Sequence, residues 1–291
     1  MDTAFFTELS TELGGAGAHT ELSGTVHSAA ACGGPWSPEL QHGGPPSALL
    51  VRVAEQLAAA AAGRTDLVSA RIAAEFLAPV PVAPLEVSAR ILRLARSAVL
   101  ISAELAVDGR PCLQARVWLM AENGSPAVPG SEQNASATAA GDGPPTLGDD
   151  SAAVGDDPTQ LTDFGMDGFP YAEHLDWRMV SGQARKPGPA STWVRARVPL
   201  VAAERPSTLQ RLALVADSAS GISSVLDWDD WSFANVDLDV HLMRQSQDDW
   251  VLMQAVSAVG AGLGMARSTL YDRAGLLGAG LQTLLIRSRR D

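Results

Sequence analysis

The pattern of apolar and polar residues in the first part of the chain predicts strands around one helix. Residues 21–26 alternate, as in a strand with one buried face. From Leu49 onward apolar residues recur at helical spacing, and Pro45 and Pro46 precede them where first-turn amides lack partners. A proline-broken, edge-like segment, two alternating segments and a hairpin signal follow, at residues 76–84, 85–94, 99–107 and 108–109. The predicted order is a strand, a long helix, and then three or four antiparallel strands.

The second part of the chain repeats this order. Two strand-like segments precede a helical segment and four follow it, at residues 176–181, 192–198, 206–224, 233–242, 250–259, 266–272 and 276–287. A repeated order of elements indicates an internal duplication. A helix among antiparallel strands is buried on most sides when the sheet curls around it. We therefore expect an α+β double hotdog, with two long helices that are each wrapped by a curved antiparallel β-sheet.

Residues 122–161 mark the clearest shift in composition. Gly, Ala, Ser, Pro and Asp dominate, and no strand or helix period survives there. The sequence thus predicts an N-terminal hotdog at 1–121, an acidic linker at 122–161 and a C-terminal hotdog at 162–291. The linker contains acidic residues but no basic residue, so the two folded halves together are less negative than the whole chain, whose net charge is -12.

Composition and charge exclude several classes of protein. The chain has 291 residues, of which 46% are hydrophobic, so it can bury a core, and its acidity opposes binding to nucleic acid. Lys186 is the only lysine and lies in no glycine-rich loop, which excludes a Walker-A site. Two cysteines and five scattered histidines predict neither a disulfide framework nor a metal site, and no cofactor is expected. Without a signal peptide or membrane span, a cytoplasmic protein is expected.

A series of short motifs occurs in an order that resembles one family. The motifs are His42-Gly43-Gly44, Phe76-Leu77, Leu92-x-x-x-Arg96-Ser97, Val215-Ala216-Asp217-Ser218, Phe233-Ala234-Asn235-Val236-Asp237, Met243-Arg244, Trp250-Val251-Leu252 and Leu281-Gln282. Apart from the linker, nearly the whole chain resembles the acyl-CoA thioesterase family, in the double-hotdog form of bacterial thioesterase II. This resemblance implies hydrolysis of acyl-CoA thioesters to a free acid and CoA, by a water molecule that an aspartate activates.

Three polar residues are the candidate catalytic residues. Asp217 lies in the middle of the second predicted helix without a basic residue three or four positions away. It is therefore either a solvated acid on the helix surface or an unpaired buried carboxylate, whose burial costs free energy. Gln282 shares a strand face with apolar residues, where it either caps a backbone group or orients a water. Asn235 belongs either to a solvated strand face or to the site, where the family usually has Thr or Ser. The resemblance implies that Asp217 activates water and that Gln282 and Asn235 orient it.

The start of the first predicted helix is the candidate oxyanion and substrate-binding site. Gly43 and Gly44 can offer backbone amides at the positive end of the helix dipole, although a Gly-Gly-Pro-Pro run is also common where a helix begins. His42 either belongs to this site or only caps the turn. In a double hotdog the helix of one half faces the active side of the other, so these amides would lie beside Asp217.

Alternatives from other classes remain open. A double hotdog that binds an acyl or other apolar ligand without hydrolysis is the main one, because Asn235 replaces the usual hydroxyl residue. A hotdog hydratase is the third hypothesis, but its Asp and His signature on one helix is absent. The resemblance also implies an acyl-CoA substrate as the partner and assembly into a homo-oligomer.

Overall fold

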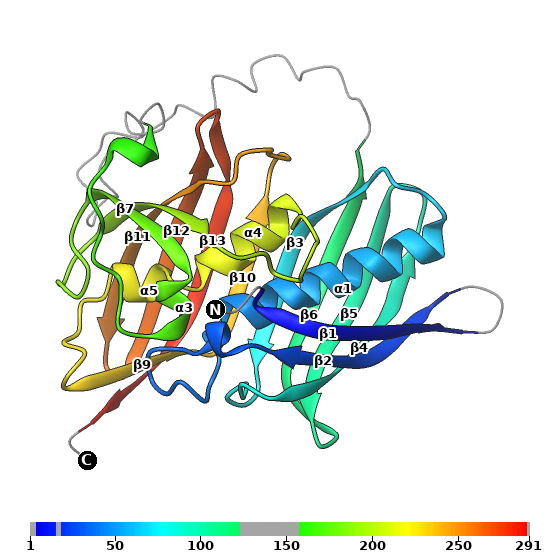
Figure 1. The fold of residues 1–291 in the computed structure, drawn as a ribbon, viewed down its shortest axis with the longest axis horizontal. Coiled ribbons are helices and arrows are strands. Elements are labelled where there is room, and N and C mark those ends of the chain that lie inside the picture. Colours follow the sequence, from blue (N-terminus) through cyan, green and yellow to red (C-terminus); the bar gives the residue numbers. More distant parts are fainter. Residues whose placement is uncertain (1–3, 16–18, 123–156, 290–291) are drawn as a thin grey trace.

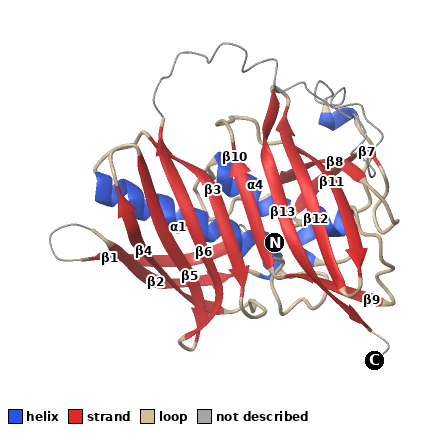
Figure 2. Ribbon diagram, turned by 180° about the vertical axis from the view of Figure 1, so that it is seen from behind, coloured by secondary structure: helices blue, strands red, loops and turns tan. Residues whose placement is uncertain are grey.

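The chain folds around one continuous antiparallel sheet. A computed structural model describes residues 4–15, 19–122 and 157–289. Thirteen strands form the sheet, with the two longer helices in a row on its inner side (Figures 1 and 2). Residues 123–156 of the predicted linker lie outside the described residues. The last residues of the linker contain a short 3-10 helix, η3 (Pro158–Gln160).

The elements of the two halves follow the same order. The first half contains β1 (Phe6–Gly14), β2 (Glu21–Ser28), η1 (Ala30–Cys32), α1 (Gly44–Ala62), β3 (Leu67–Phe76), β4 (Pro84–Leu94), β5 (Ala98–Val107) and β6 (Arg110–Ala121). The second half contains α3 (Pro170–Glu173), β7 (Leu175–Ser181), β8 (Ala190–Ala196), α4 (Thr208–Ala216), α5 (Ala219–Ile222), β9 (Trp231–Asn235), β10 (Asp237–Leu242), β11 (Val251–Gly260), β12 (Leu263–Asp272) and β13 (Gly275–Ser288).

Strand pairing confirms the duplication that the sequence predicts. The first half has the order β2-β4-β5-β6-β3, and the second half has the matching order β8-β11-β12-β13-β10. The two halves meet where β3 pairs antiparallel with β10, from Asp237 opposite Glu75 to His241 opposite Arg71. The molecule is therefore an α+β double hotdog, and the described part of each unit contains one helix of seven or more residues.

Helix α1 begins and ends at the signals expected from the sequence. Pro45 and Pro46 occupy its first turn, and it ends at Gly63, whose φ of 59° is left-handed and whose amide donates to the Ala59 carbonyl. Apolar residues are buried around most of its circumference, including Leu49, Leu50, Val53 and Leu57. A helix that is apolar on most of its sides must be enclosed by other elements, and here the sheet encloses α1.

The second helix differs from the prediction of one long helix over 206–224. Helix α4 ends at Ala216 and the one-turn helix α5 begins at Ala219. The Tyr171 hydroxyl donates to the Leu214 carbonyl at 2.8 Å, and the Ser218 amide donates instead to the Val215 carbonyl. The expected bond between residues 218 and 214 is thereby replaced, and the helix is broken at Asp217.

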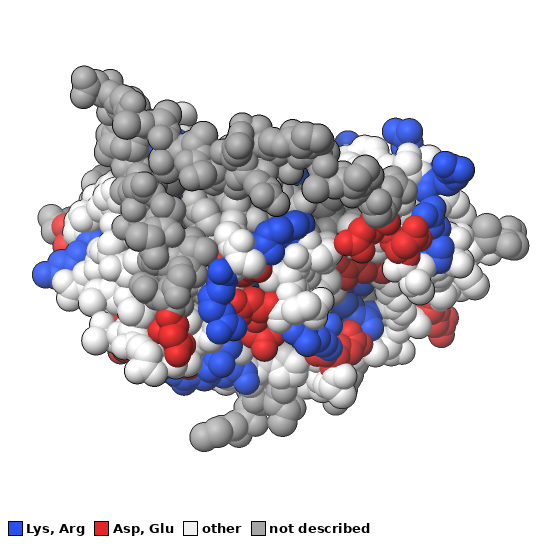
Figure 3. All heavy atoms as spheres, turned by 90° about the horizontal axis from the view of Figure 1, so that it is seen from above, with Lys and Arg blue, Asp and Glu red and all other residues white. Residues whose placement is uncertain are grey.

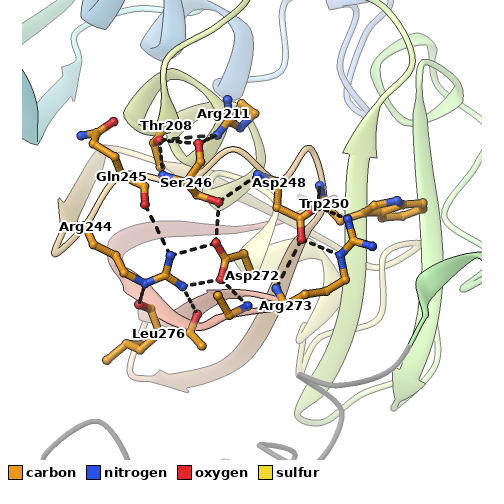
Figure 4. A network of polar contacts seen from close by, with 12 residues as sticks. Thr208, Arg211, Arg244, Gln245, Ser246, Asp248, Trp250, Asp272, Arg273 and Leu276 are labelled. Atoms are coloured by element: carbon orange, nitrogen blue, oxygen red, sulfur yellow. Dashed lines mark hydrogen bonds and ion pairs between the residues drawn. The ribbon is translucent and has the colours of Figure 1, made fainter. Parts of the chain in front are cut away.

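A polar network anchors the start of α4 (Figure 4). Ser207 caps α4 by accepting from the Gln210 amide, and the half-buried Arg244 donates to Asp272 at 2.9 Å. Burial opposes ionisation of Asp272, but hydrogen bonds from Arg244 and Ser246 outweigh it and lower the pKa of this carboxyl. The Ser246 amide also donates to Thr208 Oγ1 at 2.9 Å, so this loop joins the hairpin between β12 and β13 to the first turn of α4.

Two predicted strands have different limits in the structure. Residues 77–83 are not a strand, because their backbone bonds are irregular. Leu77 and Ala78 both donate to the Cys112 carbonyl, whereas residues 80–82 bond to the loop at 39–41, as in Gln41 N to Val80 O at 2.7 Å. The predicted strand 233–242 is divided at Val236, whose amide donates to Thr283 and whose carbonyl accepts from Phe76. Consequently β9 pairs only with β13, whereas β10 pairs with both β13 and β3.

The surface mixes both signs of charge. Seen from above, acidic and basic side chains lie next to one another rather than in separate fields (Figure 3). Ion pairs such as Arg273 with Asp248 at 2.7 Å account for part of this mixture. Among the described residues, no helix is long and apolar enough to cross a membrane.

Candidate active site

A cavity of about 440 Å³ lies between the two halves. Its walls include the loops around residues 35–43 and 76–80 of the first half and residues 217–221 and 233–236 of the second. The aromatic residues that line it are Trp36, Phe76, Phe169, Trp177, Trp228 and Phe233. A mostly apolar cavity with a few polar groups is the usual form of a site for a small molecule.

Asp217 is placed at this cavity by the break between α4 and α5. It is the C-terminal cap of α4, and only 4% of it is exposed. The prediction that it lies in the middle of a helix is therefore wrong, because α4 ends one residue before it. The break between α4 and α5 turns its carboxylate toward the cavity that it lines. Burial of a carboxylate requires polar partners, and the surrounding residues supply them.

Two side-chain amides contact the Asp217 carboxylate. Asn235, at the end of β9, donates from Nδ2 to Asp217 Oδ1 at 2.6 Å and to the Asp217 carbonyl at 3.2 Å. Gln282, on the inner face of β13 and 1% exposed, donates from Nε2 to the Asp217 carbonyl at 3.0 Å and to Oδ1 at 3.4 Å. Charge-assisted bonds of this kind are stronger than neutral ones, so they fix the orientation of the carboxylate.

His42 contacts the other carboxylate oxygen. Its Nδ1 lies 3.1 Å from Asp217 Oδ2 and 3.2 Å from the Gly44 amide nitrogen. With a proton this nitrogen donates to the carboxylate, and with a lone pair it accepts from the amide, so it serves only one of them. The bond to the carboxylate is charge assisted, which favours a proton on Nδ1. Burial lowers the pKa of His42 more than the Asp217 charge raises it, which favours the neutral ring.

Stacked aromatic rings hold the imidazole in place. The His42 and Tyr171 ring centroids are 3.8 Å apart with an angle of 3° between their planes, and the Phe169 ring lies beside both at 6.3 Å. Burial raises the pKa of the Tyr171 hydroxyl, so it stays protonated and donates to Leu214. One short element, α3, therefore supports both His42 and the end of α4.

The two glycines at the start of α1 differ in their surroundings. A Cβ on Gly43 would lie 2.8 Å from both Asp217 carboxylate oxygens, so this backbone comes directly against the carboxylate. A Cβ on Gly44 would lie 2.0 Å from the Leu214 carbonyl oxygen, so Gly44 allows α1 and α4 to pack closely. Within the described part of the chain, the Gly43 amide has no hydrogen-bond partner, whereas the Gly44 amide faces His42.

The structure brings together most of the residues that the sequence singled out. His42, Gly43, Asn235 and Gln282 surround Asp217, and Gly44 lies next to them as a packing residue. Their catalytic roles remain predictions.

Sequence reasoning missed Tyr171 and Phe169. The Phe-Pro-Tyr run at 169–171 was a usable signal, because proline often occupies the first turn of a helix and one of only two tyrosines follows it.

Two family models match the chain. Residues 33–120 match the acyl-CoA thioesterase N-terminal domain, and residues 149–286 match the acyl-CoA thioesterase C-terminal domain. No curated protein matches the chain.

Solved structures share the fold at low sequence identity. The tesB protein of Mycobacterium avium subsp. paratuberculosis is 15% identical, with 96% of each chain covered and a TM-score of 0.62. The acyl-CoA thioesterase II of Mycobacterium marinum is 17% identical, covers 96% of this chain and 95% of its own, and has a TM-score of 0.59. A conserved hotdog protein of Alicyclobacillus acidocaldarius is 16% identical, with 95% of this chain and 96% of that protein covered and a TM-score of 0.66. With both of its domain models matched in order, the chain belongs to the acyl-CoA thioesterase family.

Proposed function

We propose that this protein hydrolyses acyl-CoA thioesters with a water molecule that Asp217 activates. One observation carries the proposal: a buried carboxylate lines the cavity between the halves and accepts a 2.6 Å hydrogen bond from Asn235. Family membership supports a thioester substrate. The described residues near Asp217 include no serine or cysteine nucleophile paired with His42, which supports direct attack by water.

Each polar residue has a defined part in this reaction. Asp217 takes a proton from water as the water oxygen bonds to the thioester carbonyl carbon, and Asn235 and Gln282 hold the carboxylate and that water in place. The carbonyl oxygen becomes an oxyanion, which the Gly43 amide stabilises at the positive end of α1. The C–S bond then breaks, and the proton on Asp217 passes to the departing sulfur.

The cavity itself supports an apolar acyl group. Its aromatic lining, including Phe76 and Phe233, offers flat apolar surfaces beside Asp217. Arg287 also lines the cavity, and Arg289 lies 5.0 Å over the Trp36 ring at its wall. These guanidinium groups can meet the phosphates of CoA, so the acidity of the whole chain does not oppose this ligand.

The experiment measures release of free CoA thiol from a panel of acyl-CoAs that differ in chain length and ring content. Asp217→Asn keeps the shape of the side chain but removes the base, so we expect kcat to fall by about 10²- to 10⁴-fold. Asp239→Asn is the matched control, because Asp239 pairs with Arg71 at the join between β3 and β10, outside the cavity. Unchanged turnover in Asp217→Asn would contradict the proposal.

A non-catalytic ligand-binding protein is the second candidate. Asn235 favours it, because a hydroxyl residue is usual in the family at this point and the Asn235 amide instead bonds both the carboxylate and the carbonyl of Asp217. Tight binding of acyl-CoA without any release of CoA by the wild-type protein would support this candidate over hydrolysis.

A further inference from the structure

Gln282 uses only half of its hydrogen-bonding groups in the contacts described above. Its Nε2 donates to Asp217, but its Oε1 is buried and has no hydrogen-bond partner among the described residues. A buried amide oxygen is rarely left unpaired in a folded protein. Because an amide can rotate by half a turn, the group that holds Oε1 also decides whether Nε2 points at Asp217.

Ser268, on the neighbouring strand, carries the matching group. It is 3% exposed, and its Oγ also lacks a hydrogen-bond partner among the described residues. In the register of β12 and β13, Ser268 lies opposite Gly280 and Ala266 lies opposite Gln282. Ser268 and Gln282 are therefore diagonal neighbours on the inner face of the sheet.

Gly280 leaves the space between them open. A Cβ at Gly280 would lie 2.6 Å from Ser268 Oγ, which means that the hydroxyl reaches over this glycine toward β13. The same Cβ would lie 3.6 Å from the Cβ of Ala216, the residue before Asp217. Diagonal Cα atoms lie about 7–8 Å apart, a separation that two polar side chains can close through one water with two hydrogen bonds.

We propose that Ser268 is a positioning residue, which holds Gln282 Oε1 through one buried water and so directs Gln282 Nε2 toward Asp217. The hydroxyl of Ser268 donates to the water, and the water donates to Oε1. Ser268 contacts neither the substrate nor the carboxylate and acts only through Gln282. This inference rests on the proposed function for its effect on catalysis, but the contact itself is testable without it.

The first experiment compares Ser268→Ala with Ser257→Ala. Ser257 is a matched control, because it is a buried serine on the inner face of β11 that bonds Ser223 at 2.8 Å and not the cavity residues. We expect Ser268→Ala to lower kcat by about tenfold with KM within about twofold, since a loosened amide misplaces the base without removing a substrate contact. Ser257→Ala is expected to change neither value. Equal kcat in Ser268→Ala and wild type would overturn the proposal.

Gly280→Ala gives an independent variant. Its methyl group would displace the Ser268 hydroxyl, so kcat is expected to fall in the wild-type background. In the Ser268→Ala background the hydroxyl is absent, and the same substitution should have little further effect. Additive losses in the double variant would argue against a shared mechanism.

A second readout does not depend on activity. The side-chain amide resonances of Gln282, assigned by their loss in Gln282→Leu, are expected to shift in Ser268→Ala and to stay in place in Ser257→Ala. Unmoved resonances in Ser268→Ala overturn the positioning role. If the wild-type protein released no CoA but the resonances moved, the proposed function would fail while the contact between Ser268 and Gln282 would stand.

Discussion

At the scale of single residues, the two adjacent glycines at the start of α1 have different surroundings, one at the proposed site and one at the contact between two helices. Gly43 faces the Asp217 carboxylate, and Gly44 faces the backbone of α4 at Leu214. A methyl group added at either position meets an obstacle, but only the second obstacle is a main-chain atom. The same substitution should therefore have different consequences one residue apart.

Gly43→Ala is expected to remove activity and leave the fold. Its methyl group would lie 2.6 Å from Phe76 Cζ and 2.8 Å from both Asp217 oxygens, so these two cavity-lining side chains would have to shift. We expect kcat/KM to fall by about 100-fold, because a misplacement of about 1 Å is enough for such a loss. The melting temperature serves as the control and should fall less than in Gly44→Ala, because the obstacles at Gly43 are side chains rather than a main-chain atom. Full activity in this variant would remove Gly43 from the proposed oxyanion site.

Gly44→Ala is expected to destabilise the fold. Alanine is the better residue inside a helix, by about 0.5–1 kcal/mol, so a gain would be expected without tertiary contacts. Here its Cβ would lie 2.0 Å from the Leu214 carbonyl oxygen, and α1 and α4 would have to move apart. We expect a loss of about 1–3 kcal/mol in the free energy of unfolding, measured by urea titration. A stabilised variant would contradict the close packing.

At the scale of elements, each half presents a carboxylate to the start of the other half's helix. Asp217 at the end of α4 faces Gly43, and Glu55 in α1 accepts a 2.7 Å hydrogen bond from Ser207, the N-terminal cap of α4. Ser69 on β3 and Gln210 on α4 also donate to Glu55. Glu55 is thus the duplicated counterpart of Asp217, but side chains of the protein itself occupy its oxygens.

Glu55 predicts a pH dependence of stability. Burial raises its pKa, although hydrogen bonds from Ser69, Ser207 and Gln210 oppose the shift. A folded-state pKa above the unfolded value means that the folded protein binds the proton more tightly. This contribution to stability is complete below the unfolded pKa and is lost as pH rises through the folded pKa.

Comparison of the wild type with Glu55→Gln isolates this effect. Between acid and neutral pH, the free energy of unfolding of the wild type should fall relative to that of Glu55→Gln, whose side chain does not titrate. Acidic groups with lowered pKa, such as Asp272, contribute equally to both proteins and cancel in the difference. Urea midpoints measured at several pH values provide the test, and parallel curves for the two proteins would refute it.

The elements also mark what a sequence can predict. Alternation located β4 and β5, and prolines located the start of α1, because these signals are local. Strand β1 was missed, since its apolar residues Phe6, Leu9 and Leu13 are three and four apart, and a bulge in its pairing restores the register. The break at Asp217 was missed because it depends on the Tyr171 hydroxyl, which lies far away in sequence. The candidate site residues were chosen from family motifs, and their convergence depends on the tertiary fold.

At the scale of the whole molecule, the two halves share one core. A single cluster of buried apolar residues contains α1 residues such as Leu50 and α4 residues such as Leu212. The sheet also passes without interruption from β3 to β10. Neither half keeps its helix covered without the other, so we expect the halves to unfold together.

Natural probes in the two halves allow this prediction to be tested. Cys32 and Cys112 are buried and both lie in the first half, so their reaction with a thiol reagent reports unfolding there. Five of the seven tryptophans, among them the buried Trp177 and Trp193, lie in the second half and dominate the fluorescence. In a urea titration, brief thiol labelling and fluorescence should give the same midpoint and slope, as a two-state transition requires. Gly44→Ala should move both midpoints equally, because Gly44 lies where the two helices meet. Separate transitions, or a shift of only one probe, would mean that each hotdog is stable alone and that the cavity between them is formed by docking of two independent domains.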